Sequence, residues 1–109
     1  MAKLYSLPIY VAAAQTSGVG AVGPIVPAGL VYVLRDIDVT EQSDTAGALV
    51  IVLNSAGGVL WAAKRETTGE LGYYEWRGRQ VYTAGEQIVF RVLSGTWDIM
   101  ASGYQLTNP

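Results

Sequence analysis

The chain has 109 residues, of which 50% are hydrophobic and 15% are charged, and its seven basic and nine acidic side chains give a net charge of −2 at pH 7. This length predicts a single domain that spans residues 1–109. The charges are scattered, without the basic stripe that nucleic-acid binding requires. No apolar run is long enough to cross a membrane as a helix.

Two further features of the composition narrow the classes of function. The sequence has no cysteine and no histidine, which excludes disulfides and removes the most common general base and metal ligand. We therefore expect no metal and no cofactor. The charged fraction is low against a usual value of about 25%, so we expect another subunit to cover part of the surface.

The first predicted strand is Leu4–Val11. This short apolar stretch, followed by Ala12-Ala13-Ala14, faintly resembles a secretory signal peptide with a small-residue cleavage site. Ser6 and Pro8 interrupt the apolar run, which favours a β-strand over a signal sequence.

The sequence Gly-Val-Gly-Ala-Val-Gly at 18–23 fits the G-x-G-x-x-G pattern of a dinucleotide-binding turn. That pattern needs a helix directly after it, so that the helix N-terminus faces the pyrophosphate. Pro24 and Pro27 follow instead, and they disfavour helical geometry. We therefore interpret residues 16–29 as an irregular apolar loop. Its residues that we assign to a subunit interface are Val19 and Val22.

The second predicted strand, Leu30–Thr40, ends in a D-x-D-x-T motif that resembles the nucleophile loop of a phosphatase. In a strand, Asp36 and Asp38 share one face, and the distant lysine and carboxylates of that chemistry have no clear counterpart. We interpret both aspartates as positions on a solvated strand face. A weak cation site formed by Asp36, Asp38 and Glu41 is an open alternative.

The third predicted strand, Ala48–Leu53, is apolar on both faces, which predicts a partner over its outer side. We assign its residues Val50 and Val52 to the candidate interface. Turn-forming residues recur at an even pace between runs rich in Val, Ile, Tyr and Trp. The sequence therefore predicts an all-β fold, a sandwich or a barrel. Together with the resemblance described below, our prediction is a single antiparallel β-sandwich, jelly-roll-like, of about seven or eight strands. The remaining predicted strands are Val59–Arg65, Tyr73–Tyr82, Gln87–Leu93 and Thr96–Thr107.

The fifth predicted strand carries an aromatic row on one face and charged side chains on the other. Such a row can stack on sugar rings, or it can form core or subunit interface. We favour core or interface, with the arginines binding carboxylates or carbonyls across it, and carbohydrate binding is the alternative. The row consists of Tyr74, Trp76 and Tyr82, and the opposite face includes Arg77 and Arg79.

Catalytic patterns are weak in this sequence. Without histidine, the usual Ser-His-Asp triad cannot form, and we expect the protein not to be an enzyme. A pair of carboxylates facing each other across a cleft, as in glycosidases, is left open because nine acids are present.

Several segments, which together cover most of the chain, resemble small virion proteins of tailed bacteriophages. The nearest likeness is to short minor-tail-type proteins of phages that infect actinobacteria. The segments are KLYSLPIY at 3–10, VLRDI at 33–37, WRGRQV at 76–81, AGEQ at 84–87 and SGYQL at 102–106.

This resemblance implies a β-sandwich building block that assembles symmetrically in the virion, at the tail or tail tip. The implied partners are the chain itself, as a homotrimer, and other virion proteins. A capsid decoration protein is the alternative within this class. A module that binds a glycan or receptor on the host surface is the alternative from another class.

Overall fold

Runs rich in Val, Ile, Tyr and Trp form the strands, and segments rich in Gly, Asn and Ser form the turns between them. The computed structural model describes residues 7–16, 23–69 and 72–107, and these residues form seven strands and no helix. The strands are β1 (Leu7–Thr16), β2 (Leu30–Glu41), β3 (Leu49–Leu53), β4 (Val59–Lys64), β5 (Tyr73–Thr83), β6 (Phe90–Ser94) and β7 (Thr96–Thr107).

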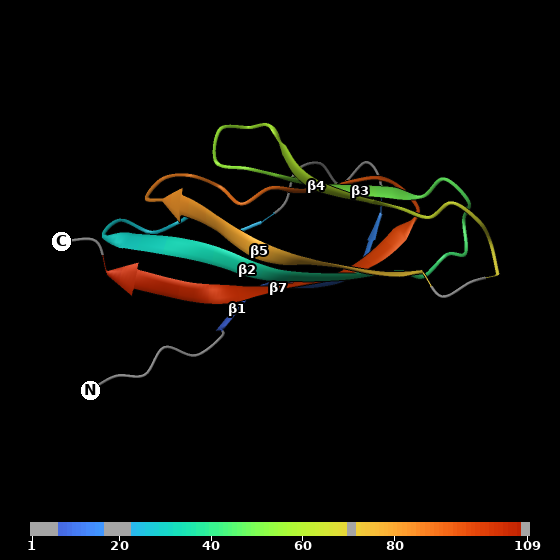
Figure 1. Cartoon of the computed structure of the whole chain (residues 1–109), viewed down its shortest axis with the longest axis horizontal. Helices are drawn as coiled ribbons and strands as arrows, with labels where there is room; N and C mark the ends of the chain where they lie inside the picture. The colour runs from blue at the N-terminus through green and yellow to red at the C-terminus, as the bar shows by residue number, and fades with distance from the viewer. Residues whose placement is uncertain (1–6, 17–22, 70–71, 108–109) are drawn as a thin grey trace.

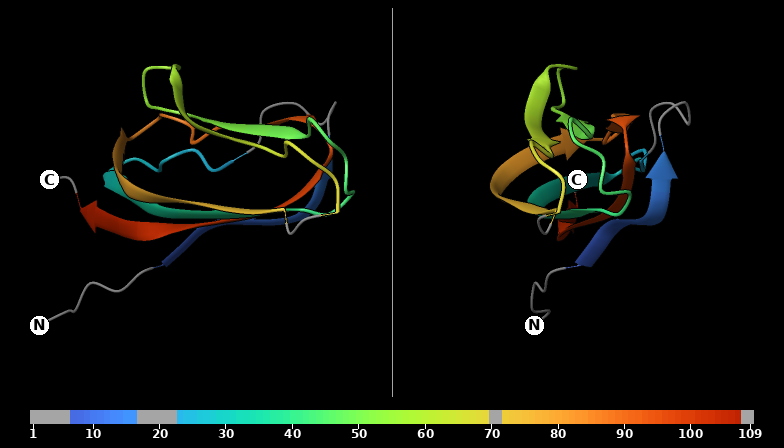
Figure 2. Two further views of the ribbon diagram at one scale, coloured as in Figure 1. Left: turned by 45° about the vertical axis from the view of Figure 1, so that its right-hand side comes forward. Right: turned by 90° about the vertical axis from the view of Figure 1, so that its right-hand side faces the viewer.

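The strands form two antiparallel sheets that face each other, so the fold is a β-sandwich, as predicted. The larger sheet has the order β1-β7-β2-β5 and the smaller has the order β4-β3-β6 (Figure 1). Figure 2 shows the smaller sheet as a separate layer over the curved larger sheet. Among the described residues, no helix is long and apolar enough to span a membrane.

The core lies between the two sheets and is built from the inward positions of alternating strands. Residues Ile37 and Val39 of β2, Val50 and Val52 of β3 and Trp97 of β7 are each at most 1% exposed. Val50 and Val52 therefore belong to the core of the chain itself. Our assignment of these two valines to a subunit interface is wrong, because their side chains face the opposite sheet.

Contacts between the sheets close both sides of the sandwich. On one side, the rings of Tyr10 and Phe90 are stacked with their centroids 4.9 Å apart. On the other side, the buried Tyr82 of β5 donates a 2.6 Å hydrogen bond from its hydroxyl to the carbonyl of Leu53. Burial, with a smaller contribution from the charge of Glu86, raises the pKa of Tyr82 to about 12. The hydroxyl therefore stays protonated as a donor at neutral pH.

Two strand boundaries within the described residues differ from the predicted ones by more than one residue. β1 continues beyond Val11 to Thr16, because residues 12–16 pair with β7. The predicted start of the sixth strand at Gln87 is wrong, since β6 begins at Phe90. Residues 86–88 instead hydrogen-bond to residues 24–26.

Gly23, the last glycine of the G-x-G-x-x-G motif, packs closely against the backbone of Ile88. Gly23 has a φ of 144°, and a Cβ atom there would lie 1.7 Å from the carbonyl oxygen of Ile88. Glycine is therefore needed for close backbone approach at this position. No helix occurs in residues 23–29, as predicted, and Val26 of this segment is 1% exposed and belongs to the core. Val19 and Val22 lie outside the described residues.

We predict that Tyr82→Phe lowers the free energy of unfolding by about 1 kcal/mol, because it leaves the buried carbonyl of Leu53 without the donor. Urea denaturation followed by tryptophan fluorescence measures this change. Tyr104→Phe, at a half-buried position on the outer face of β7, is the matched control and should change stability less. Equal effects of the two substitutions would contradict this role for the Tyr82 hydroxyl.

Candidate functional site

The aromatic row of β5 faces the interior of the sandwich. Tyr74 and Trp76 are half-buried and pack against the core, and the ring of Tyr74 lies 6.0 Å from that of Trp97, centroid to centroid. Tyr82 is fully buried. Tyr82 is therefore core rather than interface, and the row does not line an exposed groove where sugar rings could stack.

The opposite face of β5 is exposed and charged. The guanidinium of Arg77 lies 3.4 Å from the carboxylate of Asp36, 2.8 Å from that of Asp38 and 2.9 Å from that of Glu75. The Tyr73 hydroxyl donates a 2.6 Å hydrogen bond to Asp38. We call these five side chains the Arg77 network. Arg79, the other arginine that we assigned to an interface, is exposed.

The electrostatics of the Arg77 network favour the charged form of Asp38. Partial burial raises the pKa of Asp38, but the hydrogen bonds from Tyr73 and Arg77 outweigh this effect and hold the pKa below its ordinary value. Three carboxylates surround one guanidinium, so the network keeps a negative charge. Asp36 and Asp38 share the outer face, as predicted.

Glu41 lies on the opposite face from these aspartates, so the alternative of a cation site formed by Asp36, Asp38 and Glu41 is wrong. Its side chain is 0% exposed and lies 4.0 Å from the guanidinium of Arg65, which is also buried. Within the described residues, no group of three or more acidic side chains is arranged to hold a metal ion.

Backbone amides from the segment that directly follows β2 and from the start of β7 converge on the Glu41 carboxylate. It accepts hydrogen bonds from the amides of Ser43, Thr45 and Thr96 at 2.9–3.1 Å, and from the Ser43 hydroxyl at 2.6 Å. Burial raises the pKa of Glu41, but these hydrogen bonds outweigh it and lower the pKa to about 2. Nearby, Gly95 has a φ of 85°, and a Cβ there would lie 2.9 Å from the carboxylate. The carboxylate therefore organises one end of the sandwich.

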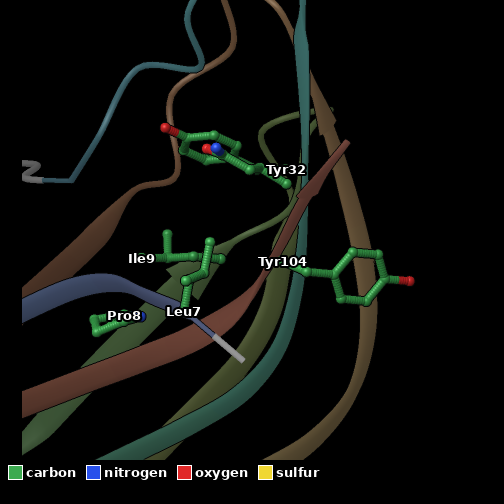
Figure 3. A pocket seen from close by; sticks show the side chains of 6 residues that line it. Leu7, Pro8, Ile9, Tyr32 and Tyr104 are labelled. Carbon is green, nitrogen blue, oxygen red and sulfur yellow. The ribbon is translucent and has the colours of Figure 1, made fainter. Parts of the chain in front are cut away.

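A small pocket of about 60 Å³ lies where β1 crosses β7 and β2. Figure 3 shows the ring of Tyr32 on the side of Leu7 and Ile9, whereas the ring of Tyr104 points away to the other side of the ribbon. Pockets for small-molecule ligands usually have volumes of about 300–1,000 Å³, so this one holds water at most.

The outer face of the smaller sheet carries an apolar row along β3. Leu49, Ile51 and Leu53 of β3 alternate with the buried valines and are half-buried on the outer side. Leu93 of β6 is 48% exposed and Val59 of β4 is 59% exposed. These five residues are called the β3 outer patch below. The sequence indicated an apolar outer face on this strand, but it did not show which of its two faces that was.

Comparison of the chain with protein-family models, with curated proteins and with solved structures finds no match. The function is therefore argued from the surfaces described above.

We predict that lowering the pH from about 4.5 to about 2 removes on the order of 3 kcal/mol of stability through Glu41 alone. The folded-state pKa is below the unfolded one, so the unfolded chain binds the proton first as the pH falls. Glu41→Gln should be less stable at pH 7 and should lose this part of the pH dependence. Denaturant titrations across this pH range measure both effects.

The matched control is Glu66→Gln, at an exposed position, which should keep the wild-type pH dependence. If Glu41→Gln also keeps the wild-type slope, the carboxylate of Glu41 is not the group that couples protonation to unfolding.

Proposed function

We propose that the protein is a structural subunit of a tailed-phage virion, located at the tail or tail tip, and that it assembles through the β3 outer patch. The observation that carries this proposal is the apolar character of β3 on both faces. Val50 and Val52 fill the core, while Leu49, Ile51 and Leu53 remain half-buried on the outer face.

An antiparallel sheet that faces water on one side normally carries polar side chains on that side. Here the side carries the β3 outer patch instead, and contiguous exposed apolar surface of this kind marks interaction sites. An interface of ordinary size buries about 800 Å² per partner. The patch supplies the apolar part of such an interface, and the exposed side chains of Arg91 and Lys64, the cross-strand neighbours of Ile51 and Leu49, supply polar groups beside it.

Self-association and the location on a virion have different support. Closed cyclic symmetry is the usual outcome when a subunit associates with itself, and we propose a homotrimer. The location on a phage particle is supported by the resemblance of segments such as 76–81 and 102–106 to minor-tail-type proteins. A capsid decoration protein would use the same patch and is the alternative. The inward direction of the aromatic row removes the observation that favoured glycan binding.

We predict that Ile51→Lys converts the oligomer to monomers without unfolding the chain, because it places a charge at the centre of the β3 outer patch. Light scattering measures the mass, and circular dichroism measures the fold. Ala56→Lys, in an exposed turn, adds the same charge elsewhere and should leave the oligomer intact. A wild-type protein that is monomeric at high concentration would contradict assembly through this patch.

The location is tested on intact particles of the phage that encodes the chain. Electron microscopy with a gold-labelled antibody should place the protein at the tail. Labelling of the head shell would overturn the tail assignment in favour of a decoration protein. Particles without the protein would overturn the virion role.

A further inference from the structure

An apolar groove of about 410 Å³ crosses the outer face of the larger sheet. Val11 and Ala13 of β1 form one wall, Met100 of β7 forms the floor, and Tyr73 of β5 stands at the far side. Val11 is 61% exposed and Met100 is 53% exposed, although they are direct cross-strand neighbours. This surface is separate from the β3 outer patch, which lies on the other sheet.

Two carboxylates border the groove. Asp38 is the cross-strand neighbour of Met100, and Asp98 is the cross-strand neighbour of Thr40. Asp98 accepts a 2.9 Å hydrogen bond from the amide of Ala14 and a further one from the side chain of Gln42. Both donors are neutral, so they fix the position of the carboxylate and leave its charge uncompensated.

The Arg77 network adds to the negative charge at this border. Asp36, Asp38, Glu75 and Asp98 carry four negative charges against the one positive charge of Arg77. Arg35 and Arg79 lie at the β-bulge of β2 and β5, beyond Asp36 and further along the strands from the groove. The apolar floor and the carboxylate border together match a cation on an apolar stem.

We propose that this groove binds a lysine or arginine side chain from an extended segment of a neighbouring protein. The methylene stem packs against Val11 and Met100, and the cationic head bonds the carboxylates of Asp98 and Asp38. Long cationic side chains bury their stems on apolar surface in this way while the charge remains in a polar setting. This inference rests on the proposed function only because the proposed assembly provides a neighbouring protein that can bind in the groove.

The charge of the face decides against a second copy as the occupant. Packing this face against itself would bring the carboxylates of two Arg77 networks together, and juxtaposed like charges repel each other. A basic partner is instead attracted by the negative charge of this face, and this attraction also increases the association rate. The occupant is therefore a basic segment of a different protein.

The test uses the full chain and capped glycine-flanked pentapeptides whose central residue is lysine, arginine or norleucine. Isothermal titration calorimetry measures affinity, and amide chemical shifts locate the site. We expect the lysine and arginine peptides to shift the amides of Ala13 and Met100. The norleucine peptide, which has the stem without the charge, should bind at least about tenfold more weakly, and raising the salt concentration should weaken the cationic peptides.

Four variants sharpen the test. Asp98→Asn should weaken the lysine peptide about fivefold, the upper end for a solvent-accessible charge pair, and it keeps an acceptor for the amide of Ala14. Val11→Lys should block the groove with its own cation, whereas Val11→Leu should not. Glu66→Gln removes one negative charge outside the groove and should change the affinity less than about twofold.

Absence of binding, equal binding of the norleucine peptide or an unchanged affinity of Asp98→Asn would each overturn the cation-binding groove. The peptide-binding results do not affect the two tests of the proposed function, which are the mass of the Ile51→Lys variant and the antibody labelling of particles. Failure of the groove can therefore be distinguished from failure of the proposed function. Conversely, cationic peptides that bind to a protein absent from virions would support the groove and overturn the virion role.

Discussion

A β-bulge at Arg35 in the central strand β2 is the constraint on which the two faces of the larger sheet depend. The pairing of β2 shifts by one residue between Leu34 and Asp36, against both β5 and β7. Relative to β7, β2 has one inserted residue, whereas relative to β5 the additional residue is in β5. Leu34 and Ile37 therefore both point into the core, and both are 0% exposed. Without the bulge, strict alternation would send one of these two side chains to the solvent.

The same bulge divides the outer face into an apolar part and a charged part. Before it, Val31 and Val33 lie on the outer side, beside Tyr104 and Leu106 of β7. After it, Asp36 and Asp38 occupy that side, and the cross-strand partner of Asp36 on β5 is Arg77. The Arg77 network and the groove therefore exist because the register change turns the aspartates outward while the apolar residues between them remain in the core.

The sequence allowed prediction of features that depend on local patterns. Turn residues and alternation were enough for the seven strands, and Pro24 and Pro27 were enough to reject a helix after the glycine motif. Features that depend on contacts between residues far apart in the sequence could not be predicted from local patterns. The Glu41 carboxylate is bound by the amide of Thr96, 55 residues away, and the only signal was an acidic residue at the end of a strand. For β3, the pattern showed two apolar faces, but only the position of the opposite sheet decides that Val50 is inside.

The two outer faces differ in the kind of partner that they favour. The five side chains of the β3 outer patch are apolar, so burying the patch against an identical one removes apolar surface from water, at about 25 cal/mol per Å². The larger sheet presents the Arg77 network, whose excess of carboxylates disfavours an identical copy and favours a basic surface. Specificity in an assembly requires repulsion of wrong contacts as well as attraction of right ones. In the proposed assembly, one face would contact copies of the chain and the other would contact a basic neighbour, and these are the two different contacts that are needed to join a symmetric ring to another protein.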